Sequence, residues 1–150
     1  MNIHSTRTLG TILRSQALER GNATFVRFEE GTLSYAAMDL LVTKAARGFA
    51  SIGVMHGPRV CIALPNGIDF LITWFGLARL GAIEVPINLE FKGAQVRYVI
   101  EDAGAEILVT NQWFLLEHHR HLEACLHLHT VILTDQAQTG LPSSRFSVRS

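Results

Sequence analysis

The chain has 150 residues, 48% of them hydrophobic, which is enough apolar material for the core of one ordinary domain. Thirteen Lys and Arg residues balance thirteen Asp and Glu residues, and this excludes the strong positive field that draws proteins to nucleic acid or anionic lipid. The longest apolar run, Phe70–Ala78, is about half as long as a membrane span requires. No basic and apolar leader opens the sequence, so we expect a cytoplasmic protein.

The first third of the sequence predicts a helix, a β-hairpin and a second helix. Residues 8–20 form the first helix, which ends at Gly21 and is expected to pack through Leu9, Ile12, Leu13 and Leu18. Residues 24–35 alternate in polarity around a turn at Glu30-Gly31, as a β-hairpin does. Ser34 then caps a long helix that ends near Gly53.

Apolar strands and helices alternate through the rest of the chain. The expected elements are strand 59–65, helix 67–80, strand 82–88, helix 93–104, strand 106–110, helix 112–126 and strand 130–134. Strands that are apolar throughout and separated by helices predict an α/β fold, with a mostly parallel sheet and helices on both faces. Asn66 is the expected N-cap of helix 67–80, which is apolar nearly all round and therefore must be buried in a larger body. Residues 136–150 are polar and aperiodic, so we expect a domain over residues 1–135 followed by a tail or linker.

Gly81 allows a tight connection between helix 67–80 and the next strand, because a left-handed residue costs glycine least. The stretch around it is "LARLGAIEVPIN", which closely resembles the "LKAGAxYVPID" element of adenylate-forming enzymes, the superfamily of acyl-CoA synthetases, luciferases and adenylation domains. Upstream, "TLSYAAM" resembles the "LTYxEL" element of the same enzymes. The sequence between the two elements is also similar to the family's, and the resemblance covers about residues 8–135. Residues 74–88 look most like medium- and short-chain acyl-CoA ligases, including those that act on carnitine-like acids.

The resemblance implies the N-terminal part of an ATP-dependent acyl-CoA ligase. Such an enzyme joins a small carboxylic acid to AMP, using Mg²⁺-ATP, and then transfers the acyl group to CoA. These steps need a glycine- and hydroxyl-rich phosphate loop, a carboxylate for magnesium and cations. The family motifs that supply them, "SGTTGxPKG" and "YGxTE" among them, do not occur in residues 1–150. We therefore expect no catalytic residue in this chain, no tight binding of ATP, Mg²⁺ or CoA, and no activity from the chain alone.

Some positions depart from the family pattern. Ala37 stands where the family usually has a Glu, so the reciprocal capping box at Ser34 is lost, at a cost of about 0.5–1 kcal/mol. Glu90 stands where some relatives carry a basic residue that approaches the CoA phosphate. Lys92 is a candidate substitute for that basic residue, and Asn88 lies at the end of a strand where open α/β sheets place ligands. Asn88 has an equally simple alternative role, which is to cap the following turn.

Three further features have a functional and a structural interpretation. Glu117, His121 and Cys125 recur at four-residue steps, as metal ligands do, but a solvated helix surface is the commoner explanation and we expect no metal site. Trp74 and Phe75 could line an acyl pocket, although aromatic pairs in apolar helices usually belong to the core. Cys61 and Cys125 lack the spacing of zinc or redox motifs, so we interpret them as reduced packing residues.

Two functions therefore compete. The first is the N-terminal portion of a ligase of fatty acid metabolism, either as a fragment or from a truncated gene. The second is a non-enzymatic remnant that binds or regulates a partner. In either case the uncovered apolar surface predicts self-association of the isolated chain.

Overall fold

The structure is a computed structural model that describes residues 8–29, 31–135 and 143–150. The described residues form these elements: α1 (Leu9–Arg20), β1 (Thr24–Phe28), β2 (Gly31–Ser34), α2 (Tyr35–Ser51), β3 (Arg59–Ala63), α3 (Ile68–Leu80), β4 (Ile83–Pro86), α4 (Ala94–Ala103), β5 (Ile107–Thr110), α5 (Gln112–Glu123), β6 (Thr130–Leu133) and β7 (Ser147–Arg149). None of these helices has both the length and the apolar character needed to cross a bilayer.

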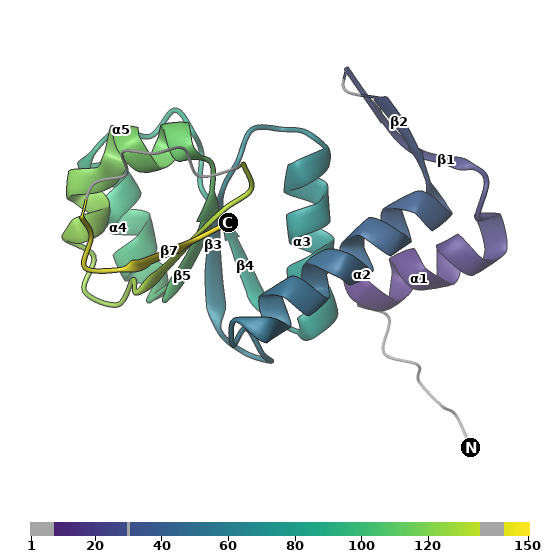
Figure 1. The fold of residues 1–150 in the computed structure, drawn as a ribbon, viewed down its shortest axis with the longest axis horizontal. Helices are drawn as coiled ribbons and strands as arrows, with labels where there is room; N and C mark the ends of the chain where they lie inside the picture. Colours follow the sequence, from purple (N-terminus) through teal and green to yellow (C-terminus); the bar gives the residue numbers. More distant parts are fainter. Residues whose placement is uncertain (1–7, 30, 136–142) are drawn as a thin grey trace.

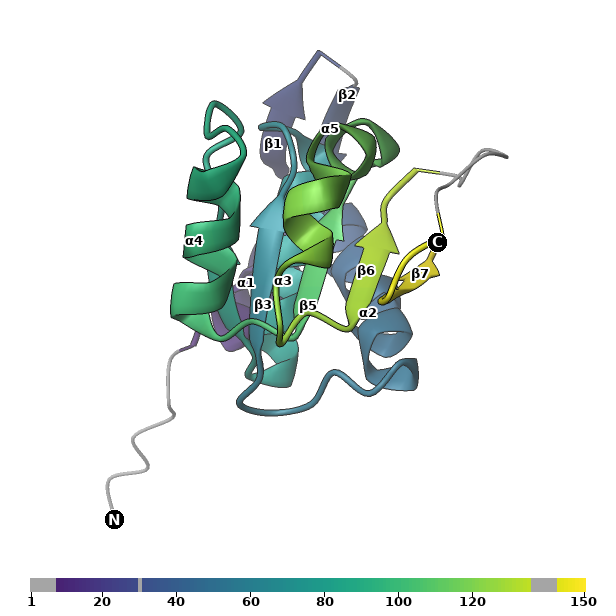
Figure 2. The same cartoon turned by 90° about the vertical axis from the view of Figure 1, so that its left-hand side faces the viewer.

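The centre of the fold is a five-stranded sheet in the order β4-β3-β5-β6-β7, and every neighbouring pair is parallel. Figure 2 shows α4 and α5 in front of this sheet and α2 and α3 behind it. Apart from Arg59 and Thr110, strands β3 and β5 are apolar because both of their faces meet helices, and from Val60 to Ala63 and from Ile107 to Thr110 every residue is buried. The predicted α/β class and the helices on both faces are confirmed.

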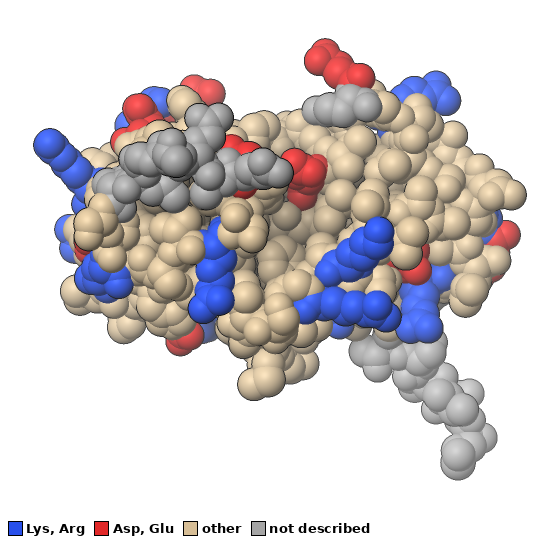
Figure 3. Space-filling model, viewed as in Figure 1, with Lys and Arg blue, Asp and Glu red and all other residues tan. Residues whose placement is uncertain are grey.

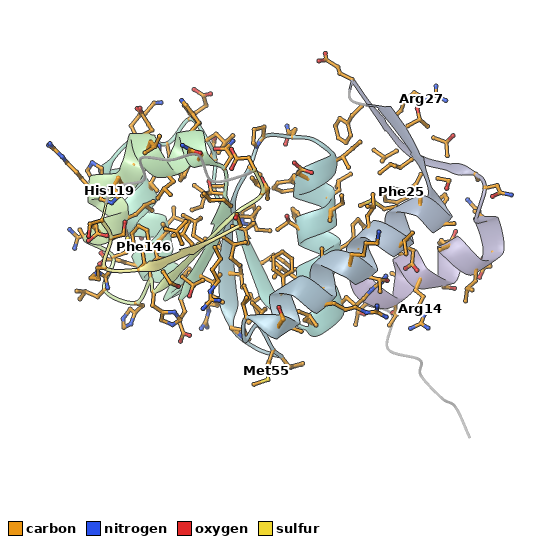
Figure 4. The ribbon with its side chains drawn as sticks, in the orientation of Figure 1. Arg14, Phe25, Arg27, Met55, His119 and Phe146 are labelled. Atoms are coloured by element: carbon orange, nitrogen blue, oxygen red, sulfur yellow. The ribbon has the colours of Figure 1, made fainter. Side chains whose placement is uncertain are left out.

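A smaller N-terminal unit extends away from the sheet. Strands β1 and β2 form the predicted antiparallel hairpin, which projects beyond α1 and α2 at the end of the molecule remote from α4 and α5 (Figure 1). Phe25 on β1 makes edge contacts with Tyr35 and Phe75, with ring centroids 5.0 and 5.9 Å away (Figure 4). The hairpin is thus held by aromatic packing on the helices. Of its predicted turn, Gly31 begins β2 and Glu30 lies outside the described residues.

Helix α1 forms where predicted, but it does not bury the apolar face that its sequence suggests. Only Leu13 of that face is buried, whereas Leu9, Ile12 and Leu18 are 46%, 43% and 84% exposed. The four residues do not fall on a single stripe, because Leu18 is five positions beyond Leu13 and so lies off its side of the helix. The helix predicted from the spacing of these four residues is present, and of the four only Leu13 belongs to the core.

Two of the predicted helix caps can be compared with the structure. Ser34 caps α2, and its hydroxyl accepts a hydrogen bond from the Ala37 amide at 3.2 Å, as predicted. Asn66 does not cap α3. The N-cap is Gly67, and no side chain accepts from the first turn of that helix. The loop takes one more residue than the sequence suggested before the helix begins.

Helix α3 is packed less completely than its composition suggested. Thr73, Gly76 and Leu77 are buried, while most of its other apolar residues are only partly covered. Gly76 lies at the crossing with α2, where a Cβ atom would come within 3.2 Å of the Phe49 ring. Gly81 ends the helix in the left-handed region, with φ of +74°, as the tight connection required.

The last part of the chain contains a strand that the sequence did not predict. Strand β7 pairs with β6, and Phe146 beside it is 4% exposed. Ser147–Arg149 of the expected tail therefore belong to the sheet, and residues 136–142 lie outside the described residues. The three-residue strand is too short to show a periodic pattern.

Candidate functional site

The strand order identifies one edge of the sheet as the place to look for a site. The chain passes from β3 through α3 to β4 on one side, and then through α4 to β5 on the other side of β3. The order therefore reverses between β3 and β5. In open α/β sheets, ligands bind in the crevice at the carboxyl ends of the strands, where such a reversal occurs.

A cavity of about 410 Å³ lies at this position. The loop after β3 lines it with Leu64–Asp69, the end of β5 contributes Asn111, and the end of β6 contributes Thr134 and Asp135. Its volume falls within the range of small-molecule pockets in proteins. The location and the size together make it the candidate site of the described residues.

The polar side chains around this cavity are engaged in holding the strand ends. Asn111 Oδ1 accepts from the Phe114 amide at 2.9 Å and so caps α5. The Asp135 carboxylate accepts from the Gln112 amide at 3.0 and 3.1 Å. The Thr110 hydroxyl donates to the Ala63 carbonyl at 2.8 Å and ties β5 to β3. These side chains therefore stabilise the strand ends at this edge of the sheet.

A second cavity of about 420 Å³ lies on the other side of β3 and shares Leu64 and Asn66 with the first. Its remaining lining comes from Phe70 and from Pro86–Leu89, which includes Asn88. Asn88 Oδ1 also accepts from the Glu90 amide at 3.0 Å. The structure thus gives Asn88 both of the features considered for it, a position at a cavity and a bond that fixes the following turn.

Lys92 lies apart from both cavities. It is exposed, and its backbone amide donates to Gln95 Oε1 at 3.2 Å where α4 begins. The pKa of His118 on α5 is lowered mainly by burial, and the positive charge of Lys92 lowers it further. The next residue, Gly93, is so close to His121 that a Cβ atom would lie 2.9 Å from the imidazole Nε2. Asn88 and Lys92 are therefore not gathered into one pocket.

The aromatic and metal hypotheses can be placed on the same structure. Phe75 packs on the hairpin, and Trp74 makes an edge contact with Phe70 at 5.2 Å, so neither lines the carboxyl-edge cavities. Cys125 lies beyond the last residue of α5, and its thiol donates to the His121 carbonyl. Among the described residues, no three His, Cys, Asp or Glu side chains gather so as to hold a metal ion.

Neither cysteine has the character of a nucleophile. Cys61 and Cys125 are both buried and free. Burial raises the pKa of the Cys61 thiol to about 12 and that of the Cys125 thiol to about 11. A thiol reacts as its thiolate, so both groups stay unreactive near neutral pH.

Sequence reasoning missed Asn111 and Asp135 as residues of the carboxyl edge. A signal was present, because each is a polar residue that comes directly, or after one Thr, behind a buried apolar strand. The carboxyl ends of parallel strands meet at one edge, so such residues are brought together by the topology.

The comparison with protein families decides the identity of the chain. The family model described as AMP-binding enzyme matches residues 13–147. The chain belongs to the AMP-binding enzyme family. A curated relative, the crotonobetaine/carnitine–CoA ligase of Salmonella paratyphi B, is 36% identical over 99 residues, which are 63% of this chain and 19% of the relative. The same protein from Salmonella enteritidis PT4 matches equally. The chain thus spans about a fifth of the length of these relatives.

Solved structures of ligases share the fold. The coronafacic acid ligase of Pectobacterium brasiliense superposes with a TM-score of 0.84 at 20% identity, over 95% of this chain and 28% of that protein. The anthranilate CoA ligase AuaEII, solved with anthranoyl-AMP, gives 0.79 at 21% identity, over 85% of this chain and 25% of that protein. The described sheet and its helices are therefore a part of the fold of adenylate-forming enzymes, as the resemblance implied.

Proposed function

We propose that this chain is the N-terminal portion of an ATP-dependent acyl-CoA ligase, which converts a carboxylic acid to an acyl-adenylate and then to an acyl-CoA. The observation that carries the proposal is the family match over residues 13–147, strengthened by the 36% identity to a CoA ligase. Within the complete enzyme, the carboxyl edge of this sheet forms one wall of the substrate or CoA entrance.

The chemistry itself belongs to parts of the enzyme other than these residues. ATP and Mg²⁺ supply the adenylate and CoA supplies the thiol, so the site needs cations around the phosphates. The cavity between β3 and β5 is lined by Asp69 and Asp135 and by no Lys or Arg. Two carboxylates repel a triphosphate, so the residues present do not fit the nucleotide phosphates. The proposed role of this segment is therefore structural.

For CoA we propose a more limited contribution from two residues at the entrance. Asn88 lines the cavity beside β4, and Lys92 is an exposed cation four residues further along the chain. In the complete enzyme, Lys92→Ala is expected to raise the KM for CoA while leaving acid-dependent exchange of pyrophosphate into ATP unchanged, because that exchange precedes CoA binding. An unchanged KM for CoA would remove Lys92 from the entrance.

The proposed function is tested with a chimera. In the crotonobetaine/carnitine–CoA ligase of Salmonella paratyphi B, this chain replaces the corresponding N-terminal segment. The chimera is expected to catalyse acid-dependent pyrophosphate exchange, and the purified 150-residue chain is expected to give only the blank rate. A folded chimera without exchange would favour the alternative of a non-enzymatic binding or regulatory domain. Exchange by the isolated chain would show that the phosphate-binding machinery had been missed.

Self-association of the isolated chain is a further part of the proposal. Exposed Leu9, Ile12, Leu18 and Leu40 on α1 and α2 leave apolar surface in water, and the formal net charge of zero provides no repulsion between copies. The chain is expected to elute as an oligomer and to bind a hydrophobic dye. A monomer without dye binding that melts cooperatively above about 60 °C would instead describe a self-sufficient domain. A cytoplasmic location is proposed as well, and fractionation of cells that express the protein tests it.

A further inference from the structure

Helix α5 has an exposed side that faces away from the sheet, and Figure 2 views the helix from that side. The opposite side of the helix holds its buried residues, Phe114, Leu115, His118 and Leu122. On the exposed side, Trp113 and Leu116 are 53% and 47% exposed, and Arg120 is exposed one turn further on. Because an α-helix turns by about 100° per residue, these three side chains leave the helix within about 60° of one another. They form a single stripe, which we call the outer stripe of α5.

Packing within the described residues does not account for the outer stripe. The ring of Trp113 contacts that of its neighbour Phe114, with centroids 6.5 Å apart, and Trp113 is still half exposed. Neither Arg120 nor the nearby Glu117 forms a side-chain hydrogen bond or ion pair with another described residue. Tryptophan and arginine are among the residues that most often carry the binding energy of protein interfaces. The stripe therefore has the composition of a contact surface for a protein.

The charges on α5 indicate which protein fits this surface. Glu117 is exposed and lies beside the outer stripe, three residues before Arg120. If two copies of α5 lie antiparallel with Leu116 near the centre, Trp113 of one copy faces Arg120 of the other, and that Arg120 also comes close to Glu117. A parallel arrangement would instead place Arg120 against Arg120, which repulsion between like charges disfavours. Figure 3 shows side chains of both charges, rather than one sign alone, at the end of the molecule that carries α5.

We propose that a second copy of this chain binds along α5, antiparallel and related by a twofold axis near Leu116. Leu116 packs on its own counterpart at the axis, and on either side the Arg120 guanidinium lies over the Trp113 ring and pairs with Glu117. The contact is small, because the 12-residue helix is only about 18 Å long, so the dimer is weak and reversible. Helix α5 lies on the other side of the sheet from α2, so this contact is separate from the self-association expected of the apolar residues on α1 and α2.

The charges supply the sharpest test, which is made in the chimera with the Salmonella paratyphi B ligase. Sedimentation velocity over a range of concentrations measures the dissociation constant of the dimer. Arg120→Glu and Glu117→Arg each bring like charges together, so each is expected to raise that constant by at least about tenfold. The double variant exchanges both charges and is expected to associate more tightly than either single variant. Arg47→Glu makes the same change of charge at an exposed position of α2, and this control should have little effect.

The apolar part of the contact is tested with Trp113 and Leu116. Trp113→Ala is expected to raise the dissociation constant by at least about tenfold, as loss of a tryptophan anchor does. Tyr98→Ala is the matched control, since Tyr98 is a 67% exposed aromatic residue on the neighbouring α4. A short bismaleimide is expected to join two copies of the Leu116→Cys variant, whose thiols lie at the twofold axis, but not two copies of the Tyr98→Cys variant. Native Cys61 and Cys125 are buried and do not compete.

Several outcomes would overturn the inference. Association that Arg120→Glu and Trp113→Ala leave unchanged would place the interface elsewhere, and a double variant no tighter than the single variants would show that the two charges do not meet. A monomeric chimera whose Leu116→Cys thiol resists a simple maleimide would show that another part of the enzyme covers α5. A monomeric chimera whose thiol reacts freely would show that α5 has no partner. None of these measurements uses catalysis, so a chimera without pyrophosphate exchange counts against the proposed function and still tests the dimer.

Discussion

The two faces of the parallel sheet are closed to different degrees, although the same strands supply both. On the face under α4 and α5, the row Cys61, Leu108 and Val131 is fully buried, and Val148 of β7 still packs against the core. On the opposite face, burial decreases from Val109 to Ile132 and ends before Arg149. Apolar alternation in a strand therefore does not reveal whether a helix covers it, because cover depends on the neighbouring elements.

The C-terminal segment explains why the first face is closed up to its edge. Phe146 is buried there and lies near His119 of α5, with ring centroids 6.1 Å apart (Figure 4). The Arg145 guanidinium donates hydrogen bonds to the carbonyls of Glu123, Cys125 and Leu126 at the end of α5. A cation is favourable at a helix C-terminus, so this segment is held by both charge and packing.

The largest expected effect comes from truncating one side chain on each face of the sheet and comparing the losses of stability. Phe114→Ala removes a fully buried ring of α5, and we expect it to lower the free energy of unfolding by about 3–5 kcal/mol. Ile132→Ala on the open face is expected to cost only about 1 kcal/mol, because a partly exposed side chain loses less burial. Urea denaturation of both variants measures the difference. Equal losses would mean that the open face is as well packed as the closed one.

The sheet core was predictable from sequence because its signals are local. The apolar strands, the helices between them, the Ser34 cap and the left-handed Gly81 each depend on residue types within a few positions. The family elements around Gly81 then identified the fold as well. Register and strand order were not predictable in this way, since they depend on contacts between distant segments.

The misses have physical reasons as well. Strand β7 owes its place to the buried Phe146 and the bonds of Arg145, which are tertiary contacts that no periodicity announces. Asn66 was expected to cap α3, but the helix begins one residue later, with Gly67 as its N-cap. At the candidate site, Asn88 could be placed at a strand end from sequence. The cavity lined by Asn111 and Asp135 required the strand order.

A smaller effect is expected from two glycines, Gly81 and Gly48, that differ both in backbone conformation and in the space around them: a Cβ atom at Gly81 would lie 2.6 Å from the His56 ring, whereas one at Gly48 would meet nothing within 4 Å. Gly81 has φ of +74°, so Gly81→Ala is expected to lower the free energy of unfolding by about 1–2 kcal/mol. Gly48 lies within α2 with open space around it, so Gly48→Ala is expected to raise the free energy of unfolding by about 0.5–1 kcal/mol. Thermal and chemical denaturation of the pair check the opposite signs. Destabilisation by Gly48→Ala would show that the space around Gly48 is not open in the isolated chain.

The packing of the sheet face under α4 and α5 is tested through Arg145. Replacing it with Ala removes three donors to the end of α5, and we expect a loss of about 1 kcal/mol, because the site is partly in water. Hydrogen exchange of the β7 amides should accelerate, while that of β3 should not change. Arg120→Ala, an exposed residue of the same helix, is the control. Unchanged exchange at Ser147, whose amide donates to the His129 carbonyl, would show that β7 does not depend on Arg145.

The smallest effect concerns a histidine inside the closed face. His118 on α5 is 2% exposed, its ring lies 4.4 Å from that of Phe114, and its Nε2 atom is buried without a hydrogen-bond partner among the described residues. Burial lowers the pKa of His118 from its ordinary value of 6.5, and the charges of Lys92 and His121 act in the same direction, while Glu117 opposes them. The folded protein thus favours the neutral imidazole more than the unfolded chain does.

The sign of the pH dependence follows from proton binding. As the pH falls through about 6.5, the unfolded chain binds a proton at His118 more readily than the folded protein does, so the free energy of unfolding falls as the pH decreases through that range. His118→Gln removes this contribution, and its stability should decline less steeply between pH 7 and pH 5 than that of the unmodified chain, whatever its stability at pH 7. Urea denaturation across this interval measures the slopes. His127→Gln is the control for the substitution itself, because His127 is an exposed histidine outside the closed face. A slope that His118→Gln does not alter would mean that water reaches the imidazole, and that the closed face is more open at α5 than its packing indicates.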